Sequence, residues 1–172
     1  MLPLPDPPLS WPGGHLRPWQ PEDAARLVDA WTDPEIARWN PVPPDPSIER
    51  ASGWIDGCQV RLEQRRSVDL CIASAKAPDT VVGEVGLSGF DWDRRAALIG
   101  YWLLPDGRGQ GLAAQATAIF TEWAFASLQL HVVVARCATD NTASQSVAQR
   151  AGYVHVQSDG AGNELWIRQA FG

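Results

Sequence analysis

Several features are scarce in this chain of 172 residues, and each scarcity excludes a class of protein. No stretch approaches ~18 apolar residues, and the start, MLPLPDPPLSWPGG, lacks the basic region and apolar core of a secretory signal. Lys and Arg number 14 against 20 Asp and Glu, so the net charge of −6 argues against a nucleic-acid-binding protein. We therefore expect neither nucleic acid nor a membrane among its partners.

Cysteine is scarce as well. Cys58, Cys71 and Cys137 are odd in number, far apart and without a CxxC pair, so the sequence predicts neither a disulfide framework nor a metal site. This usage is typical of a reducing compartment, and we expect a cytoplasmic protein. The length and the 45% hydrophobic content suffice for one compact core. We expect a proline-rich lead over 1–14 and a single domain over 15–172.

The periodicity of the chain predicts the order β-α-α-β-β-β-α-β-α-β-β. Helices are expected over 20–31, 47–63, 112–128 and 142–152. Strands are expected over 15–19, 67–75, 80–90, 94–105, 131–138, 153–157 and 164–169. The connections between the three central strands, KAPD and DWD, are too short for a crossover helix, so these strands should form antiparallel hairpins.

One loop stands out, LLPDGRGQGLAAQA over 103–116, because it places three glycines between an apolar strand and a helix. Such a loop leaves backbone N–H groups uncovered at a helix N-terminus, where they can bind phosphate oxygens. The side chain of Arg108 could add a positive charge. The alternative is a glycine-rich turn that binds nothing.

The loop also fits the dinucleotide pattern G-x-G-x-x-A through Gly109, Gly111 and Ala114, with Asp140 as a ribose partner. That fold needs parallel strands on both sides of the site, whereas the three preceding strands read as a meander. A P-loop is excluded because no Gly-Lys-Ser/Thr follows.

The segment Arg108-Gly109-Gln110-Gly111-Leu112-Ala113 matches Q/R-x-x-G-x-G/A, the signature of the GNAT superfamily of acetyl-CoA-dependent N-acetyltransferases, which this sequence resembles from about His15 onward. Three blocks look like the RimJ/RimL branch of ribosomal-protein alanine N-acetyltransferases: LRPWQPEDAARLVDAWTDPEIARW, IGYWLLPDGRGQGLAAQA and DNTASQSVAQRAGY. The resemblance implies an α/β (α+β) fold, with a mixed and mostly antiparallel twisted sheet flanked by helices.

The resemblance also implies where acetyl-CoA binds. The loop amides would hold the pyrophosphate, and the strand ending at Leu104 would splay from 131–138 and leave backbone groups for the pantetheine arm. The N–H of Leu103 would stabilise the oxyanion of the intermediate. It assigns to coenzyme A the residues Trp102, Leu103, Leu104, Arg108, Gly109, Gln110, Gly111, Leu112, Ala113, Asn141 and Ser144.

The proton donor to the leaving thiolate departs from the family pattern. Many relatives carry a tyrosine four residues after the position of Ser144, but this chain has Ala148 there. Ser144 is therefore our candidate for the donor, with Tyr153 behind it. The alternative for Asn141 and Ser144 is helix capping, for which both residue types are suited.

The general base departs as well, because Leu98 stands where relatives of this branch often have glutamate. Glu84 is our candidate, since a carboxylate in an otherwise apolar strand has a raised pKa. The alternative is a solvated sheet face. Cys137 lies beside the expected pantetheine channel and could form a disulfide with coenzyme A, or it is a small core residue.

From these residues we expect an N-acetyltransferase that acts by direct attack in a ternary complex. The acceptor would be a small primary amine or a peptide N-terminus, in a cleft roofed by the second helix with Trp54 and by RWNPVPPDP. A non-catalytic acyl-CoA-binding module is the alternative, because the glutamate and tyrosine of the family are missing. A homodimer is compatible with the sequence but not predicted by it.

Overall fold

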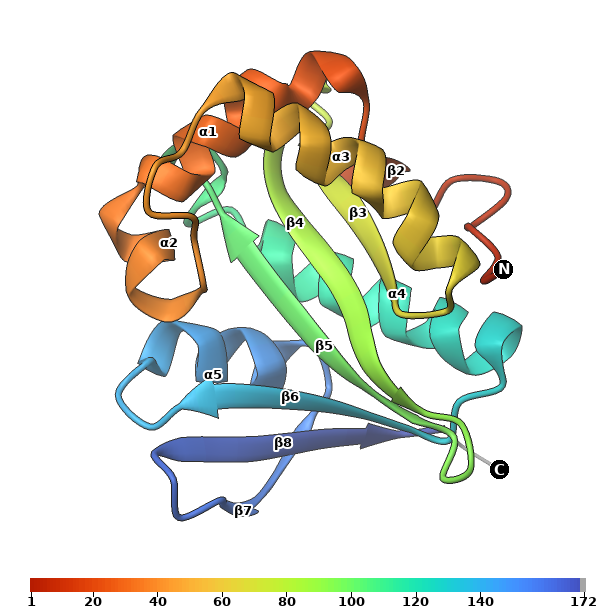
Figure 1. The fold of residues 1–172 in the computed structure, drawn as a ribbon. Coiled ribbons are helices and arrows are strands. Elements are labelled where there is room, and N and C mark those ends of the chain that lie inside the picture. Colours follow the sequence, from red (N-terminus) through yellow and green to blue (C-terminus); the bar gives the residue numbers. More distant parts are fainter. Residues whose placement is uncertain (171–172) are drawn as a thin grey trace.

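The computed structural model describes residues 1–170 and is built around one eight-stranded sheet (Figure 1). The strand order is β1-β2-β3-β4-β5-β6-β8-β7. The strands are β1 (Ser10–Trp11), β2 (Gly14–Pro18), β3 (Ser67–Ser74), β4 (Ala77–Asp91), β5 (Ala96–Leu103), β6 (Val132–Ala138), β7 (Val154–Ser158) and β8 (Asn163–Gln169). Neighbouring strands are antiparallel except β5 and β6, which are parallel.

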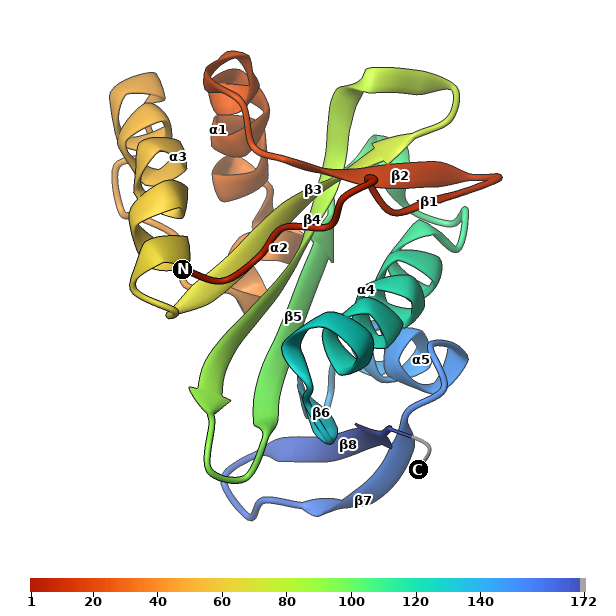
Figure 2. The same cartoon turned by 90° about the vertical axis from the view of Figure 1, so that its right-hand side faces the viewer.

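Helices cover both faces of this sheet (Figure 2). On one face lie α1 (Ala24–Thr32), α2 (Pro34–Trp39) and α3 (Ile48–Glu63), and on the other lie α4 (Leu112–Leu128) and α5 (Thr142–Arg150). Two short 3-10 turns, η1 (Pro21–Asp23) and η2 (Pro105–Gly107), precede α1 and α4. The parallel pair β5 and β6 is joined by α4, since a parallel connection needs a crossover of that length. The predicted fold class is confirmed.

The core lies in two layers, one on each side of the sheet. The larger layer packs β3–β6 against α4 and α5 around the fully buried Phe120. The second packs the other face against α1 and α3 around Leu27 and Ile55. Ser47 begins α3 as predicted, because its side chain accepts a hydrogen bond from the Arg50 N–H. The next residue, Ile48, is 53% exposed.

Two elements were not predicted from the sequence. The proline-rich lead contains β1, which pairs with β2 at the sheet edge, and its Leu2 is buried and donates its N–H to the Leu62 carbonyl. An edge strand tolerates neighbouring prolines because its outer N–H groups need no partner. The other is α2, which the sequence does signal through Asp33 as N-cap and Pro34 at the first helical position.

Within residues 1–170 no helix combines the length and the apolar character that crossing a bilayer would require.

Candidate active site

The sheet opens between its two parallel strands. β5 and β6 are paired only from Ala96 with Val132 to Ile99 with Ala135, although both strands continue further. A cavity of about 430 Å³ occupies the gap. It is lined by residues of α2 (Glu35, Ile36, Trp39, Asn40), of β5 (Ile99, Gly100, Tyr101, Trp102, Leu103), of the loop and start of α4 (Arg108, Gly109, Ala113), of β6 (Ala135, Arg136, Cys137, Ala138), of the α5 region (Asn141, Ala143, Ser144, Val147) and by Asn163. The splay expected between these strands is present.

The register of β5 decides which backbone groups face the cavity. Leu104 donates its N–H to the Val82 carbonyl of β4 at 2.9 Å. Because successive residues of a strand point their N–H and C=O groups to opposite sides, Trp102 and Leu104 face β4, whereas Tyr101 and Leu103 face the cavity. Leu104 is therefore not placed at the site as the sequence suggested. It is 2% exposed and packs on Ala30 and Ile36.

The glycine loop has the backbone that its sequence predicts. Gly109 and Gly111 have φ values of +74° and +75°, in the region that glycine adopts without strain, and Gly111 is the N-cap of α4. Within residues 1–170 no protein group accepts a hydrogen bond from the backbone N–H groups of 109–114. Free backbone donors at a helix N-terminus are suited to binding an anion. Gly107 has another role, since a Cβ there would lie 2.8 Å from the Val82 carbonyl oxygen.

The other residues of the loop differ in where their side chains go. Arg108 lines the cavity, but its guanidinium is held by the protein: Nε donates to the Leu103 carbonyl at 3.0 Å, and Nη2 contacts Asp33 Oδ1 at 2.6 Å. Gln110 turns back to donate to the Asp106 carbonyl. The remaining two, Leu112 and Ala113, are buried, and Ala113 lines the cavity.

Asn141 and Ser144 lie together at the start of α5, on the cavity wall. Asn141 Oδ1 accepts a hydrogen bond from the Ser144 N–H at 3.0 Å, so the capping interaction is made. The hydroxyl of Ser144 is not used for capping. It lies 3.2 Å from Cys137 Sγ and 3.3 Å from the Tyr101 hydroxyl oxygen.

Tyr101 completes this cluster and was not singled out from the sequence. Its hydroxyl donates to the Ser144 backbone carbonyl at 2.9 Å. Burial raises the pKa of Tyr101 above its ordinary range, and burial also raises the pKa of the Cys137 thiol. Both groups are therefore protonated at neutral pH. No local signal could have singled out Tyr101, because its neighbour Trp102, on the opposite face of β5, lines the same cavity.

Tyr153 is not at the site, so the structure does not support it as a second candidate for the proton donor. It follows α5, is 3% exposed, and its hydroxyl lies 2.6 Å from Thr121 Oγ1 in the core beneath α4. Tyr153 is also absent from the residues that line the cavity.

Glu84 lies in β4 opposite Trp102, in an enclosure of indole rings. Its Oε2 accepts a hydrogen bond from Trp19 Nε1 at 3.0 Å, and the Trp19 ring is 5.6 Å from Trp54 and 6.3 Å from Trp102, centroid to centroid. Burial, with the nearby negative charge of Asp69, raises the Glu84 pKa to about 8, while the two indole N–H groups of Trp19 and Trp102 act in the opposite direction. This is not an openly solvated sheet face. Glu84 does not line the cavity itself, but Trp102 does.

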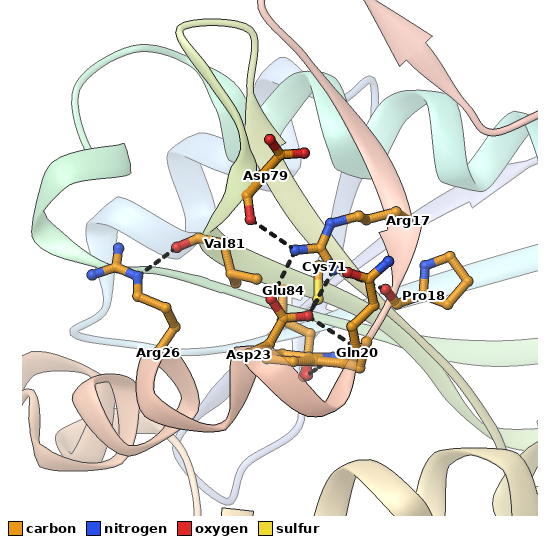
Figure 3. Close-up of polar contacts among 10 residues, drawn as sticks. Arg17, Pro18, Gln20, Asp23, Arg26, Cys71, Asp79, Val81 and Glu84 are labelled. Carbon is orange, nitrogen blue, oxygen red and sulfur yellow. Dashed lines mark hydrogen bonds and ion pairs between the residues drawn. The ribbon is translucent and has the colours of Figure 1, made fainter. Parts of the chain in front are cut away.

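A buried ion pair supports this enclosure from behind (Figure 3). Asp23 accepts two hydrogen bonds from Arg17, at 2.7 and 2.8 Å, and a third from the Gln20 N–H. The pair joins β2 to the turn before α1, on either side of Trp19, and so supports the position from which the indole donates to Glu84. Breaking a buried pair of this kind typically costs several kcal/mol, about 3–5.

On the face covered by α1–α3, the floor beside Glu84 is made of glycine. Gly86 and Gly100 are paired across β4 and β5, and a Cβ at Gly100 would have no neighbour within 4 Å. Next to them Leu98 is 40% exposed. The opposite wall is α2, where the Glu35 carboxylate accepts a hydrogen bond from Trp39 Nε1 at 2.7 Å. The structure thus leaves an open space with an acidic side chain, which the sequence alone did not indicate.

Metal-ligating residues are dispersed in this structure. Among residues 1–170 no three His, Cys, Asp or Glu side chains come together as a metal site would require.

The geometry above, a parallel pair that opens onto a glycine loop and a helix N-terminus, coincides with a match to a family model. Residues 15–154 match the model described as the acetyltransferase (GNAT) domain. This chain belongs to the GNAT acetyltransferase family. As a GNAT enzyme it uses acetyl-CoA, so the predicted activity class and cosubstrate are confirmed.

One relative supports the same assignment, and two solved structures share the fold. The chain is 30% identical over 130 residues to the N-acetyltransferase p20 of Bacillus licheniformis, covering 75% of this chain and 72% of that protein. Its fold superposes with a TM-score of 0.80 on RimJ of Mycobacterium smegmatis in complex with CoA-disulfide, at 24% identity over 95% of this chain and 86% of that one. It also superposes with a TM-score of 0.80 on RimL, a ribosomal-protein acetyltransferase bound to coenzyme A through a disulfide to one of its cysteines, at 19% identity over 94% and 97% of the two chains.

Proposed function

We propose that this GNAT enzyme transfers acetyl from acetyl-CoA to the primary amine of a small molecule or of a short peptide N-terminus, by direct attack in a ternary complex. The observation that carries the proposal is the cavity where β5 and β6 part. One side of it is formed by the glycine loop, Cys137 and Ser144, and the other by α2 and by Gly100 of the glycine floor. Both substrates can therefore meet in one space without a covalent enzyme intermediate.

The glycine-loop side suits acetyl-CoA. The unpaired N–H groups of 109–114 would bind the pyrophosphate, because a helix N-terminus and free amides both favour negative charge. The N–H and C=O groups of Tyr101 would pair with the amides of the pantetheine arm. The carbonyl of Leu103 is already taken by Arg108. This leaves the Leu103 N–H as the donor for the oxyanion that forms when the amine attacks.

Ser144 is placed to assist the departing thiolate. It has one hydroxyl proton, and Tyr101 fixes its backbone by donating to the Ser144 carbonyl. The proton can point toward Cys137 Sγ, toward the Tyr101 hydroxyl oxygen, or toward a sulfur of the cosubstrate entering beside them. A hydroxyl hydrogen bond to a forming thiolate stabilises the transition state more than the thioester.

The acceptor would approach over the glycine floor. Amines are protonated near neutral pH and must lose a proton before attack. Glu84, with a pKa raised to about 8, would accept this proton. The transfer would pass through a water molecule, because Trp102 lines the cavity and the Glu84 carboxylate does not. Glu35 and the rings of Trp39 and Trp102 would attract the cationic form of the amine into the cleft.

The test is a rate comparison. Peptides that begin with Ala or Ser, polyamines, aminoglycosides and amino acids would be supplied at equal concentration with acetyl-CoA, and release of the CoA thiol would be followed. We expect turnover with at least one of these classes, and intersecting lines when both substrates are varied. Parallel lines would indicate a covalent intermediate. Acetylation confined to an intact ribosomal protein would contradict the proposed acceptor class.

Replacement of the Ser144 hydroxyl should slow the chemical step. In Ser144→Ala we expect kcat to fall about 100-fold, the scale of a lost proton donor, with the dissociation constant of acetyl-CoA nearly unchanged. Ser146→Ala is the matched control, because Ser146 lies on the same helix and does not line the cavity. Wild-type kcat in a folded Ser144→Ala protein would leave Ser144 with no more than a place in the capped first turn of α5.

Cys137 should form a mixed disulfide with coenzyme A. Its sulfur lies in the cavity, 3.2 Å from Ser144 Oγ. With CoA disulfide as reagent, the Cys137 thiolate attacks one sulfur, the enzyme–CoA disulfide forms, and the second CoA leaves as its thiol. The rate should increase with pH, because the thiolate reacts and burial raises the Cys137 pKa.

Intact-mass analysis would show one CoA adduct that dithiothreitol removes. The adduct should be absent in Cys137→Ala and retained in Cys58→Ala, since Cys58 is part of α3 and lies outside the cavity. Persistence of the adduct in Cys137→Ala would refute the assignment.

A further inference from the structure

The side chain of Arg108 connects three parts of the active site. It belongs to the glycine loop, yet its Nε donates to the Leu103 carbonyl at the end of β5, and its Nη2 contacts Asp33 at the start of α2. The Leu103–Leu104 peptide unit is thereby fixed at both ends, because its N–H donates to Val82 of β4. The loop, the cavity-facing end of β5 and α2 are held by one guanidinium.

Helix α2 has few other contacts to hold it. It has six residues, and a helix so short is not stable by itself in water. Ile36 is its one buried residue, packed on Ala30 and Leu104. A second ion pair, Arg38 with Asp140 at 3.3 Å, is largely exposed and so contributes little. The position of α2 therefore depends strongly on Asp33.

Asp33 makes two interactions at once. One carboxylate oxygen, Oδ1, accepts the Ile36 N–H at 2.9 Å as the helix cap and also contacts Arg108 at 2.6 Å. The Asp33 side chain is 10% exposed, against 38% for Arg108. Burial acts to raise the Asp33 pKa, but the hydrogen bonds from Arg108 and from the Ile36 N–H lower it overall, so the carboxylate is charged and the pair is ionic.

We propose that Asp33 and Arg108 are positioning residues that place the acceptor wall of α2 against the cosubstrate loop. In this role Arg108 is not a phosphate ligand, although its place in the loop suggests one. The inference rests on the proposed function, since it takes Glu35, Trp39 and Asn40 as the wall that receives the amine. It predicts that loss of the pair weakens the acceptor rather than acetyl-CoA.

Two single variants and their double variant test this. Asp33→Asn removes the charge but retains a side chain that can cap α2, and Arg108→Gln removes the guanidinium. We expect each to raise the KM of the amine about tenfold and to change the KM of acetyl-CoA less than twofold. The double variant should be no worse than the poorer single variant, because both remove one interaction. Asp106→Asn is the matched control: it removes the ion pair of η2 with Arg26 of α1, outside the cavity.

The opposite pattern would overturn the inference. If Arg108→Gln weakens acetyl-CoA binding severalfold while Asp33→Asn leaves the KM of the amine unchanged, Arg108 is a phosphate ligand. Unchanged kinetics in both variants would also exclude the positioning role, with the proposed function left intact.

A readout without turnover separates this inference from the proposed function. In α2 the Ala37 N–H donates to the Asp33 carbonyl, and the Asn40 N–H donates to the Ile36 carbonyl. Their hydrogen exchange should be at least tenfold faster in Asp33→Asn than in wild type or in Asp106→Asn. Equal exchange in all three proteins would refute the positioning role, whether or not an acceptor is found.

Discussion

Gly109→Val should abolish detectable binding of coenzyme A in a protein that still folds. Gly109 lines the cavity with a φ of +74°, and a Cβ there would have no protein atom within 4 Å, so valine would project into the space above the loop. Its β-branched side chain disfavours this φ and would turn the neighbouring N–H groups away. Losing two charge-assisted hydrogen bonds lowers affinity by about 100-fold or more. Calorimetric titration with coenzyme A would measure it.

The control for backbone strain is Gly160→Val. Gly160 has a φ of +72° and likewise no neighbour within 4 Å, but it lies in the turn between β7 and β8. Both variants should lose a similar free energy of unfolding, about 1–2 kcal/mol. Only Gly109→Val should lose coenzyme A. Wild-type affinity in folded Gly109→Val would mean that the loop amides do not bind the pyrophosphate.

Glu84→Gln should produce the second large effect, a fall in kcat of about 100-fold or more, because glutamine cannot accept the proton of the amine. A general base works in its deprotonated form, so the wild-type rate should increase with pH up to about 8, the pKa of Glu84, and then level off. With the same acceptor, the rate of Glu84→Gln should not show this increase with pH. Glu63→Gln, on the exposed face of α3, should behave as wild type.

The same substitution tests the pKa without any activity. The pKa of Glu84 is about 8 in the folded protein against an ordinary 4.5, so below about pH 4.5 the carboxyl is protonated in both states. Between these values the unfolded chain ionises and the folded one does not, and stability is lost as the pH rises. The Tm of Glu84→Gln relative to wild type should therefore increase from pH 5 to pH 8. That increase without a change in kcat would show a buried carboxyl that is not the base.

The sequence by itself determined the parts of this protein that depend on local patterns. Alternation and short connections indicated the β3–β4–β5 meander, Ser47 marked the start of α3, and the glycines of 107–111 marked the loop before α4. Each of these follows from residues a few positions apart, whose turn chemistry and periodicity act in any context. The family, the fold class and the cosubstrate were accessible because the segment 108–113 and three longer blocks resemble the GNAT superfamily.

Only the tertiary structure decided which side chains meet. Tyr101 contacts Ser144 from 43 positions away, Trp19 contacts Glu84 from 65, and Asp33 contacts Arg108 from 75. The register of β5 against β4 turned Leu104 away from the cavity, and the packing of α4 took Tyr153 into the core. Such contacts are set by how strands and helices pack across the sheet, and a one-residue change of register would exchange the residues that face the site. No local pattern in the chain records that choice.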